Sequence, residues 1–141
     1  MKISVDSQAI LLLCSRLGLS SSSERTPLTL KEWNMLVKKL QALDLRPADL
    51  LGYSVEQLQS SLSIGAEEAE RIARLLERSG SLAIEMERLA SLGISALTRA
   101  DTDYPSRYRQ RLKEAAPSVL FYSGERALLG QPGIAVVGSR H

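Results

Sequence analysis

The sequence predicts a mainly α-helical protein, in which a helical N-terminal domain precedes the start of an α/β domain. Two capping boxes, each followed by apolar residues at helical spacing, predict the helical part. The run Ile134–Val137 predicts the α/β part: it is uncharged and mostly β-branched, as in a strand buried on both faces of a parallel sheet. Because such a strand needs neighbours, and this chain supplies few, we expect the front part of a longer protein, cut as its α/β domain begins.

Composition and charge indicate the broad class. The chain has 141 residues, enough for one domain or two small ones, and a net charge of +2. Residues 1–98 carry 11 basic and 12 acidic side chains, a net −1, whereas residues 99–141 carry 7 and 4, a net +3. The longest apolar run, Ala9–Cys14, is far too short to span a bilayer, so we predict a cytoplasmic protein without membrane contact. The single cysteine, Cys14, is expected to be a buried structural thiol and not a nucleophile.

Residues 1–53 are predicted to form a helical extension. Asp6 is the expected N-cap of a first helix that runs to about Leu17. Four apolar residues in succession within it predict a helix buried nearly all round. Pro47 can start a short helix that runs through Leu51.

The first capping box, Thr29 and Glu32, opens a second helix in this extension. Its apolar stripe consists of Trp33, Leu36, Val37 and Leu40. We interpret Trp33 as a core anchor, because tryptophan is highly buried on average, and only secondarily as a stacking platform for bases.

Residues 54–92 are predicted to form a second helical module of the helix-hairpin-helix or SAM-like kind. The second capping box, Ser54 to Gln57, opens its first helix. A strong amphipathic helix is expected over Ala66–Arg78, a break at Ser79–Gly80, and a further helix over Ser81–Ser91.

The turn between the first two helices of this module resembles the phosphate-gripping turn of helix-hairpin-helix units, which normally carries two glycines. Ser63 stands in place of the first glycine, and Gly65 is the second. Three carboxylates begin the next helix: Glu67, Glu68 and Glu70. Since these would repel phosphate, we interpret the unit as structural or as a protein-contact module, with DNA binding as the less favoured alternative.

Residues 93–141 are predicted to begin the α/β domain. Short strands are expected over Ile94–Thr98 and Val119–Tyr122. Between them, the turn Asp101–Pro105 should launch a helix. One helical turn over Glu125–Leu129 then leads to the terminal strand.

Two groups of residues are candidates for binding a polyanion. Four cations lie within seven residues on the predicted helix: Arg107, Arg109, Arg111 and Lys113. The terminal strand is followed by Gly138, Ser139 and Arg140, a tight turn that places a guanidinium for phosphate. The alternatives are a solvated helix face and an ordinary structural turn.

Three tyrosines could supply rings for base stacking: Tyr104, Tyr108 and Tyr122. Packing is the favoured interpretation for Tyr104 and Tyr122, because half-buried tyrosine is the common case.

Four segments in this order carry a resemblance to a known family. They are Gly93-Ile94, the run Thr98-Arg99-Ala100-Asp101-Thr102-Asp103-Tyr104-Pro105, the run Pro117-Ser118-Val119-Leu120-Phe121-Tyr122-Ser123-Gly124, and the run Ile134-Ala135-Val136-Val137-Gly138-Ser139-Arg140. Together they resemble the DNA-processing protein A family, also called DprA or Smf. The resemblance is close from residue 93 onward and loose over residues 54–92.

The resemblance implies a Rossmann-like domain, truncated here, that binds single-stranded DNA, forms dimers and loads the recombinase RecA during transformation and recombination. It places Gly138, Ser139 and Arg140 in the phosphate-contacting pocket. It implies no enzyme activity and no cofactor.

Two rival interpretations stay open. The first is a Rossmann-like nucleotide-binding sensor or nucleoside-monophosphate hydrolase. The second is a helical module that binds another protein. The residues themselves show no catalytic constellation, since the only histidine, His141, is terminal and no serine has a histidine partner.

Overall fold

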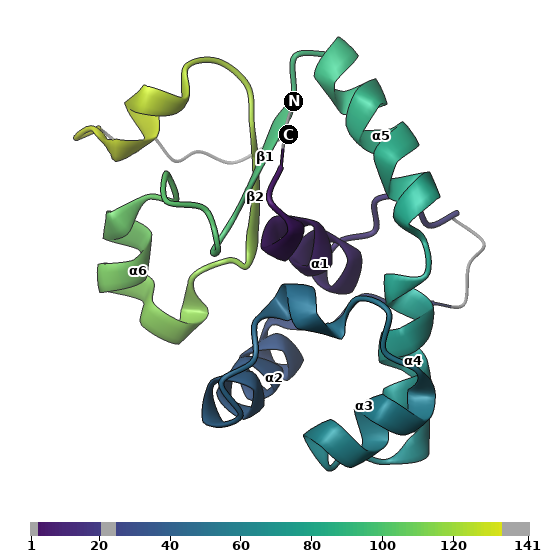
Figure 1. The fold of residues 1–141 in the computed structure, drawn as a ribbon. Helices are drawn as coiled ribbons and strands as arrows, with labels where there is room; N and C mark the ends of the chain where they lie inside the picture. Colours follow the sequence, from purple (N-terminus) through teal and green to yellow (C-terminus); the bar gives the residue numbers. More distant parts are fainter. Residues whose placement is uncertain (1–2, 21–24, 134–141) are drawn as a thin grey trace, which may run out of the picture.

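The computed structural model describes residues 3–20 and 25–133. Helices make up most of this part, and one antiparallel pair of strands follows them (Figure 1). In chain order the elements are α1 (Val5–Cys14), α2 (Leu30–Ala42), η1 (Pro47–Leu50), α3 (Val55–Leu62), α4 (Ala66–Leu76), α5 (Ser79–Ser91), β1 (Ser95–Thr98), α6 (Ser106–Leu112), η2 (Lys113–Ala115), β2 (Val119–Tyr122) and η3 (Arg126–Gly130). The predicted fold class, a helical part followed by the start of an α/β domain, is confirmed.

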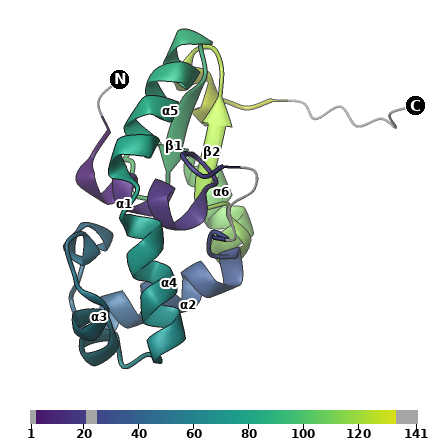
Figure 2. The same ribbon diagram turned by 90° about the vertical axis from the view of Figure 1, so that its right-hand side faces the viewer.

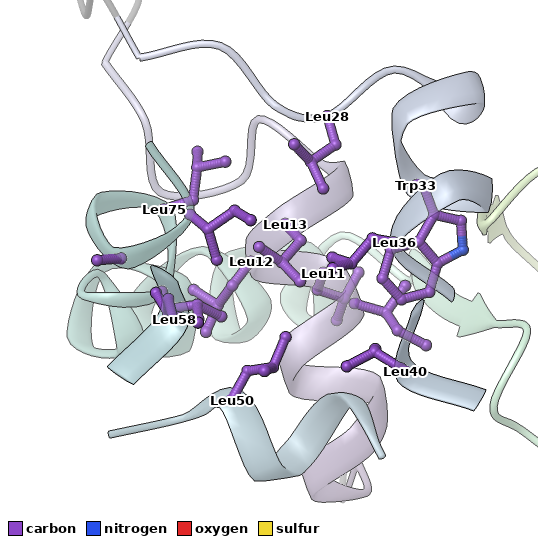
Figure 3. Close-up of a cluster of buried hydrophobic side chains, with 14 of the residues drawn as sticks. Leu11, Leu12, Leu13, Leu28, Trp33, Leu36, Leu40, Leu50, Leu58 and Leu75 are labelled. Atoms are coloured by element: carbon purple, nitrogen blue, oxygen red, sulfur yellow. The ribbon is translucent and has the colours of Figure 1, made fainter. Parts of the chain in front are cut away.

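Helix α1 occupies the centre of the molecule, between the helices on one side and the strands on the other (Figures 1 and 2). It is buried nearly all round, as its apolar run predicts: every residue from Ala9 to Leu13 is at most 2% exposed. Its side chains meet others from α2, η1, α3 and α4 in one cluster (Figure 3). That cluster also includes Trp33, buried as predicted, and Ala96 of β1, so it draws on all three predicted segments.

The ends of α1 differ from the prediction. Ser4, and not Asp6, is the N-cap, since its hydroxyl accepts from the Ser7 N–H at 3.1 Å. Asp6 lies in the first turn, where the dipole favours a carboxylate, and accepts from the Ala48 N–H of η1 at 2.9 Å. The helix ends at Cys14, since the backbone of Ser15 turns extended, and the Ser15 hydroxyl donates to the Leu11 carbonyl at 2.6 Å.

The helices that follow start largely where the sequence predicts. Both predicted capping boxes are formed, at Thr29 and at Ser54. The predicted break at Ser79–Gly80 is wrong: α4 ends at Leu76 and α5 already begins at Ser79. The interruption falls at Arg78, whose side chain is drawn into the core.

Arg78 closes the C-terminal end of α1. Its guanidinium is 5% exposed and donates to three carbonyl oxygens, those of Leu12, Ser15 and Leu17, each at 2.6 Å. Carbonyls at the end of a helix lack partners within it, so a buried cation satisfies both their hydrogen bonding and the negative end of the dipole. Burial lowers the pKa of Arg78 to about 10, which leaves it protonated at neutral pH.

Gly18 lets the chain after α1 run tightly against α5. Its φ is +81°, and a Cβ there would lie 2.9 Å from the backbone nitrogen of Leu82. A larger residue would therefore push α5 away from α1.

Strands β1 and β2 pair antiparallel, with Ser95 opposite Tyr122 and Thr98 opposite Val119. Both predicted strands are thereby confirmed. The sheet is joined to α1 by polar side chains: the Ser7 hydroxyl shares a hydrogen bond with the Thr98 hydroxyl at 2.8 Å and donates to Asp101 Oδ1 at 2.9 Å.

Arg71 of α4 fastens the chain that enters α2. Glu67 is four residues earlier on the same helix, but the Arg71 guanidinium pairs with Glu32, with Nη1 and Oε2 2.5 Å apart. It also donates to the carbonyls of Thr26 and Pro27. These contacts, with the Thr29 N–H, hold the pKa of Glu32 below its usual value. Glu70 and Arg74, four residues apart on α4, form an ion pair.

Replacing Arg78 by methionine should lower the free energy of unfolding by about 3 kcal/mol, because three buried carbonyls lose a charged donor. Urea unfolding measures this. The control is Arg16→Met, an exposed neighbour whose loss should change stability by less than about 0.5 kcal/mol. Equal stabilities for Arg78→Met and the wild type would refute the capping role.

Replacing Glu32 by glutamine should make stability less dependent on acid pH. The lowered pKa of Glu32 gives a stabilisation fully present above its ordinary pKa of 4.5 and lost as the pH falls through the lowered value. The deficit of Glu32→Gln in the free energy of unfolding should thus be largest at pH 7, about 1 kcal/mol for a partly exposed pair, and shrink at pH 3, as measured by urea unfolding at both pH values. Glu87→Gln, at an exposed site on α5, is the control. A deficit equal at both pH values would contradict the assignment.

Candidate nucleic-acid interface

Helix α6 stands at the end of the two-stranded sheet where β1 finishes and β2 begins (Figure 1). The turn that leads into it is fixed by Asp101, whose Oδ2 accepts from the Thr98 N–H at 2.7 Å. Its other oxygen accepts from Ser7 of α1. The position of α6 is therefore set by the core helix and by the register of the sheet.

Arg109 is the one cation of the predicted cluster that holds α6 in place. Its guanidinium lies over the Tyr104 ring, 5.1 Å from the centroid, and donates to the carbonyls of Arg99 and Asp101. Arg109 is therefore engaged with its own chain, a role that the sequence did not indicate, and its DNA contact stays a prediction. This role becomes visible only in the structure, where Arg109 contacts the turn that precedes α6.

Tyr104 and Tyr122 pack as predicted. Tyr104 is 3% exposed, and its hydroxyl donates to the Pro117 carbonyl at 2.6 Å. Tyr122 is half-buried beneath Arg126, whose Nε donates to its hydroxyl at 2.7 Å and whose Nη1 pairs with Asp103 at 3.0 Å.

Tyr108 differs from those two rings, because its side chain reaches solvent. It is 40% exposed and meets the Tyr104 ring edge-on, at a centroid distance of 6.2 Å. The contact with buried Tyr104 supports the ring on one side, and its exposed part is accessible for stacking.

The other three cations of the cluster are exposed: Arg107, Arg111 and Lys113. Within the described part of the chain, their side chains make no hydrogen bond or ion pair. The neighbouring carboxylates are neutralised, since Glu114 pairs with Lys38 at 3.3 Å and Asp103 with Arg126. We call the set Arg107, Tyr108, Arg111 and Lys113 the α6 face.

The α6 face combines cations with an exposed ring, which is the chemistry that single-stranded nucleic acids require. The predicted turn at Gly138, Ser139 and Arg140, and the strand Ile134–Val137 before it, lie outside the described residues and remain predictions.

The turn between α3 and α4 has a different character. Ser63 takes the left-handed conformation, φ 53° and ψ 49°, at the place of the first glycine of a helix-hairpin-helix turn. Glu67, Glu68 and Glu70 are exposed on the first turns of α4. Their charge opposes phosphate binding at this turn, so the interpretation of the unit as structural or protein-contacting stays a prediction.

Other kinds of site find little support in residues 3–20 and 25–133. They contain no group of three histidine, cysteine or acidic side chains arranged for a metal ion. Burial raises the pKa of the Cys14 thiol to about 12, which keeps it protonated and unreactive at neutral pH. Among the helices described, none is both long and apolar enough to cross a membrane.

Residues 95–141 match the model of the family described as DNA recombination-mediator protein A. This segment is similar to the DNA-processing protein A family. The resemblance predicted from the sequence is thereby confirmed, and the match starts at the first residue of β1. It contains the whole α6 face together with Arg109 and the predicted turn from Gly138 to Arg140. Neither a curated protein nor a solved structure matches the chain.

Proposed function

We propose that this chain binds single-stranded DNA through the α6 face and serves DNA recombination and transformation without catalysing a reaction. The observation that carries the proposal is the α6 face itself: three uncommitted cations and an exposed ring, inside the segment matched by a family described as a DNA recombination mediator. Phosphate attraction supplies most of the affinity of such surfaces, and stacking adds to it without sequence preference.

The wider role follows from the family resemblance. In this proposal the bound strand is presented to the recombinase RecA in the cytoplasm, and the protein dimerises through the Rossmann-like part. The proposal assigns residues 1–53 to a helical extension, 54–92 to a helix-hairpin-helix or SAM-like module and 93–141 to the beginning of the DNA-binding domain. The Gly138–Ser139 turn would hold Arg140 on a phosphate of the bound strand.

The α6 face can be tested by removing two of its charges. For Arg107→Gln/Arg111→Gln, the slope of log affinity against log salt should fall by about 1.4, because each lost phosphate contact on a single strand contributes about 0.7. Fluorescence anisotropy with a labelled thymidine oligonucleotide at several salt concentrations gives the slope. The matched control is Lys31→Gln/Lys39→Gln on α2, which removes the same charge elsewhere. Equal slopes for the wild type and the α6 variant would reject this face as the binding surface.

The predicted phosphate contact of Arg140 can be tested by comparing lysine and alanine at this position. Arg140→Lys should weaken binding although it keeps the charge, because an ammonium cannot meet phosphate through two parallel hydrogen bonds. Arg140→Ala should weaken it more, and by the same factor for thymidine and adenosine oligonucleotides. Identical affinity for all three proteins would remove Arg140 from the site.

A further inference from the structure

A concave surface is lined by residues other than those of the α6 face. It is a cleft of about 730 Å³, bounded by the turn after α1, the approach to α2, the middle of α5, and β2 with the residues before it. Its volume falls within the range of about 300–1,000 Å³ that is usual for ligand pockets. None of the four residues of the α6 face lines this cleft.

The cleft has apolar walls and an aromatic side chain on its lining. Leucines from the turn after α1 and from the approach to α2 form much of the wall, and Pro117 and Val119 add to it. Phe121 of β2 lines the same cleft and is 49% exposed. Exposing half of a phenylalanine ring to water costs free energy, which a molecule that covers the ring would recover.

Two guanidiniums line this cleft as well. Arg88 pairs with Glu85 at 2.9 Å, so its charge is compensated. Arg16 is exposed, and its side chain makes no hydrogen bond or ion pair with the residues that the structure describes. The net charge of the lining is therefore +1, carried by Arg16.

The surroundings of Arg16 favour an anion. Buried Arg78 donates to the carbonyl of Leu17, a residue of the cleft wall. After burial, repulsion from Arg25 and Arg16 is a further cause of the lowered pKa of Arg78. Arg16 and Arg78 thus both lie at the end of α1, and a phosphate bound at Arg16 would relieve the repulsion between these two cations.

We propose that this cleft receives one nucleotide of single-stranded DNA, with the base against Phe121 and the phosphate at Arg16. The inference rests on the proposed function and adds a second contact point to it, on a different surface from the α6 face. Apolar walls, one ring and one uncompensated guanidinium match a nucleotide better than an acidic peptide, which would bring several charges into an apolar cleft.

The test uses a five-residue thymidine oligonucleotide with 2-aminopurine at its centre, whose fluorescence is quenched on stacking. Phe121→Leu keeps apolar bulk but removes the ring, and should lower affinity about tenfold and abolish the added quenching, as expected for one lost stacking contact. Arg16→Gln should lower the salt slope by about 0.7. The matched controls lie outside the cleft: Leu128→Ala changes an exposed apolar residue, and Lys31→Gln removes an exposed cation. Thermal melting verifies that all variants are folded.

The outcomes separate this inference from the proposed function. If the wild type binds the oligonucleotide and both cleft variants bind it equally well, the cleft is not a nucleotide site, while the α6 proposal stands. If the wild type binds no oligonucleotide, both proposals fail. If the amide NMR signals of Gly18 and Phe121 move only on adding a glutamate-rich peptide, the occupant is an acidic peptide and the nucleotide assignment is overturned.

Discussion

The burial of α1 and the capping of its last carbonyls by Arg78 is the interaction on which the rest of the structure depends. A helix that is apolar all round has to be covered on every side, and here other helices, the short η1 segment and the sheet all contribute. Covering the helix also buries carbonyl oxygens at its C-terminal end. The Arg78 guanidinium supplies the three donors that this end needs, and in doing so it fixes where α5 departs.

The same helix positions the candidate binding surface. Ser7, one turn into α1, bonds Thr98 and Asp101, so the end of β1 and the turn before α6 are anchored to the core. Arg109 then ties α6 to that turn. The geometry of the α6 face is thus established by the fold before any ligand arrives. The backbone of α6 therefore needs no ordering on binding, and the entropic cost falls on its exposed side chains.

Local signals explain what the sequence could predict. The capping boxes, the buried Trp33 and both strands rest on spacing and residue type within a few positions, and all are present. The errors arise where a partner is distant in the chain. Arg71 pairs with Glu32, 39 residues away, and not with Glu67 on its own helix. Arg78 lies in the interruption between α4 and α5, within the helix that the sequence predicts, and its side chain bonds carbonyls more than 60 residues earlier in the chain. In the candidate site, the basic cluster is evident from its sequence, whereas the engagement of Arg109 with its own chain required three-dimensional contacts.

The central claim is that α1 joins the helical part and the sheet into one cooperative unit. Urea unfolding followed by Trp33 fluorescence and by the amide NMR signals of Ala96 and Leu97 tests it most directly, since the first reports on the helices and the second on β1. A shared core predicts one transition, with the same midpoint and the same slope for both probes. Loss of the β1 signals at a clearly lower urea concentration than the Trp33 change would contradict the claim and make the sheet an independent appendage.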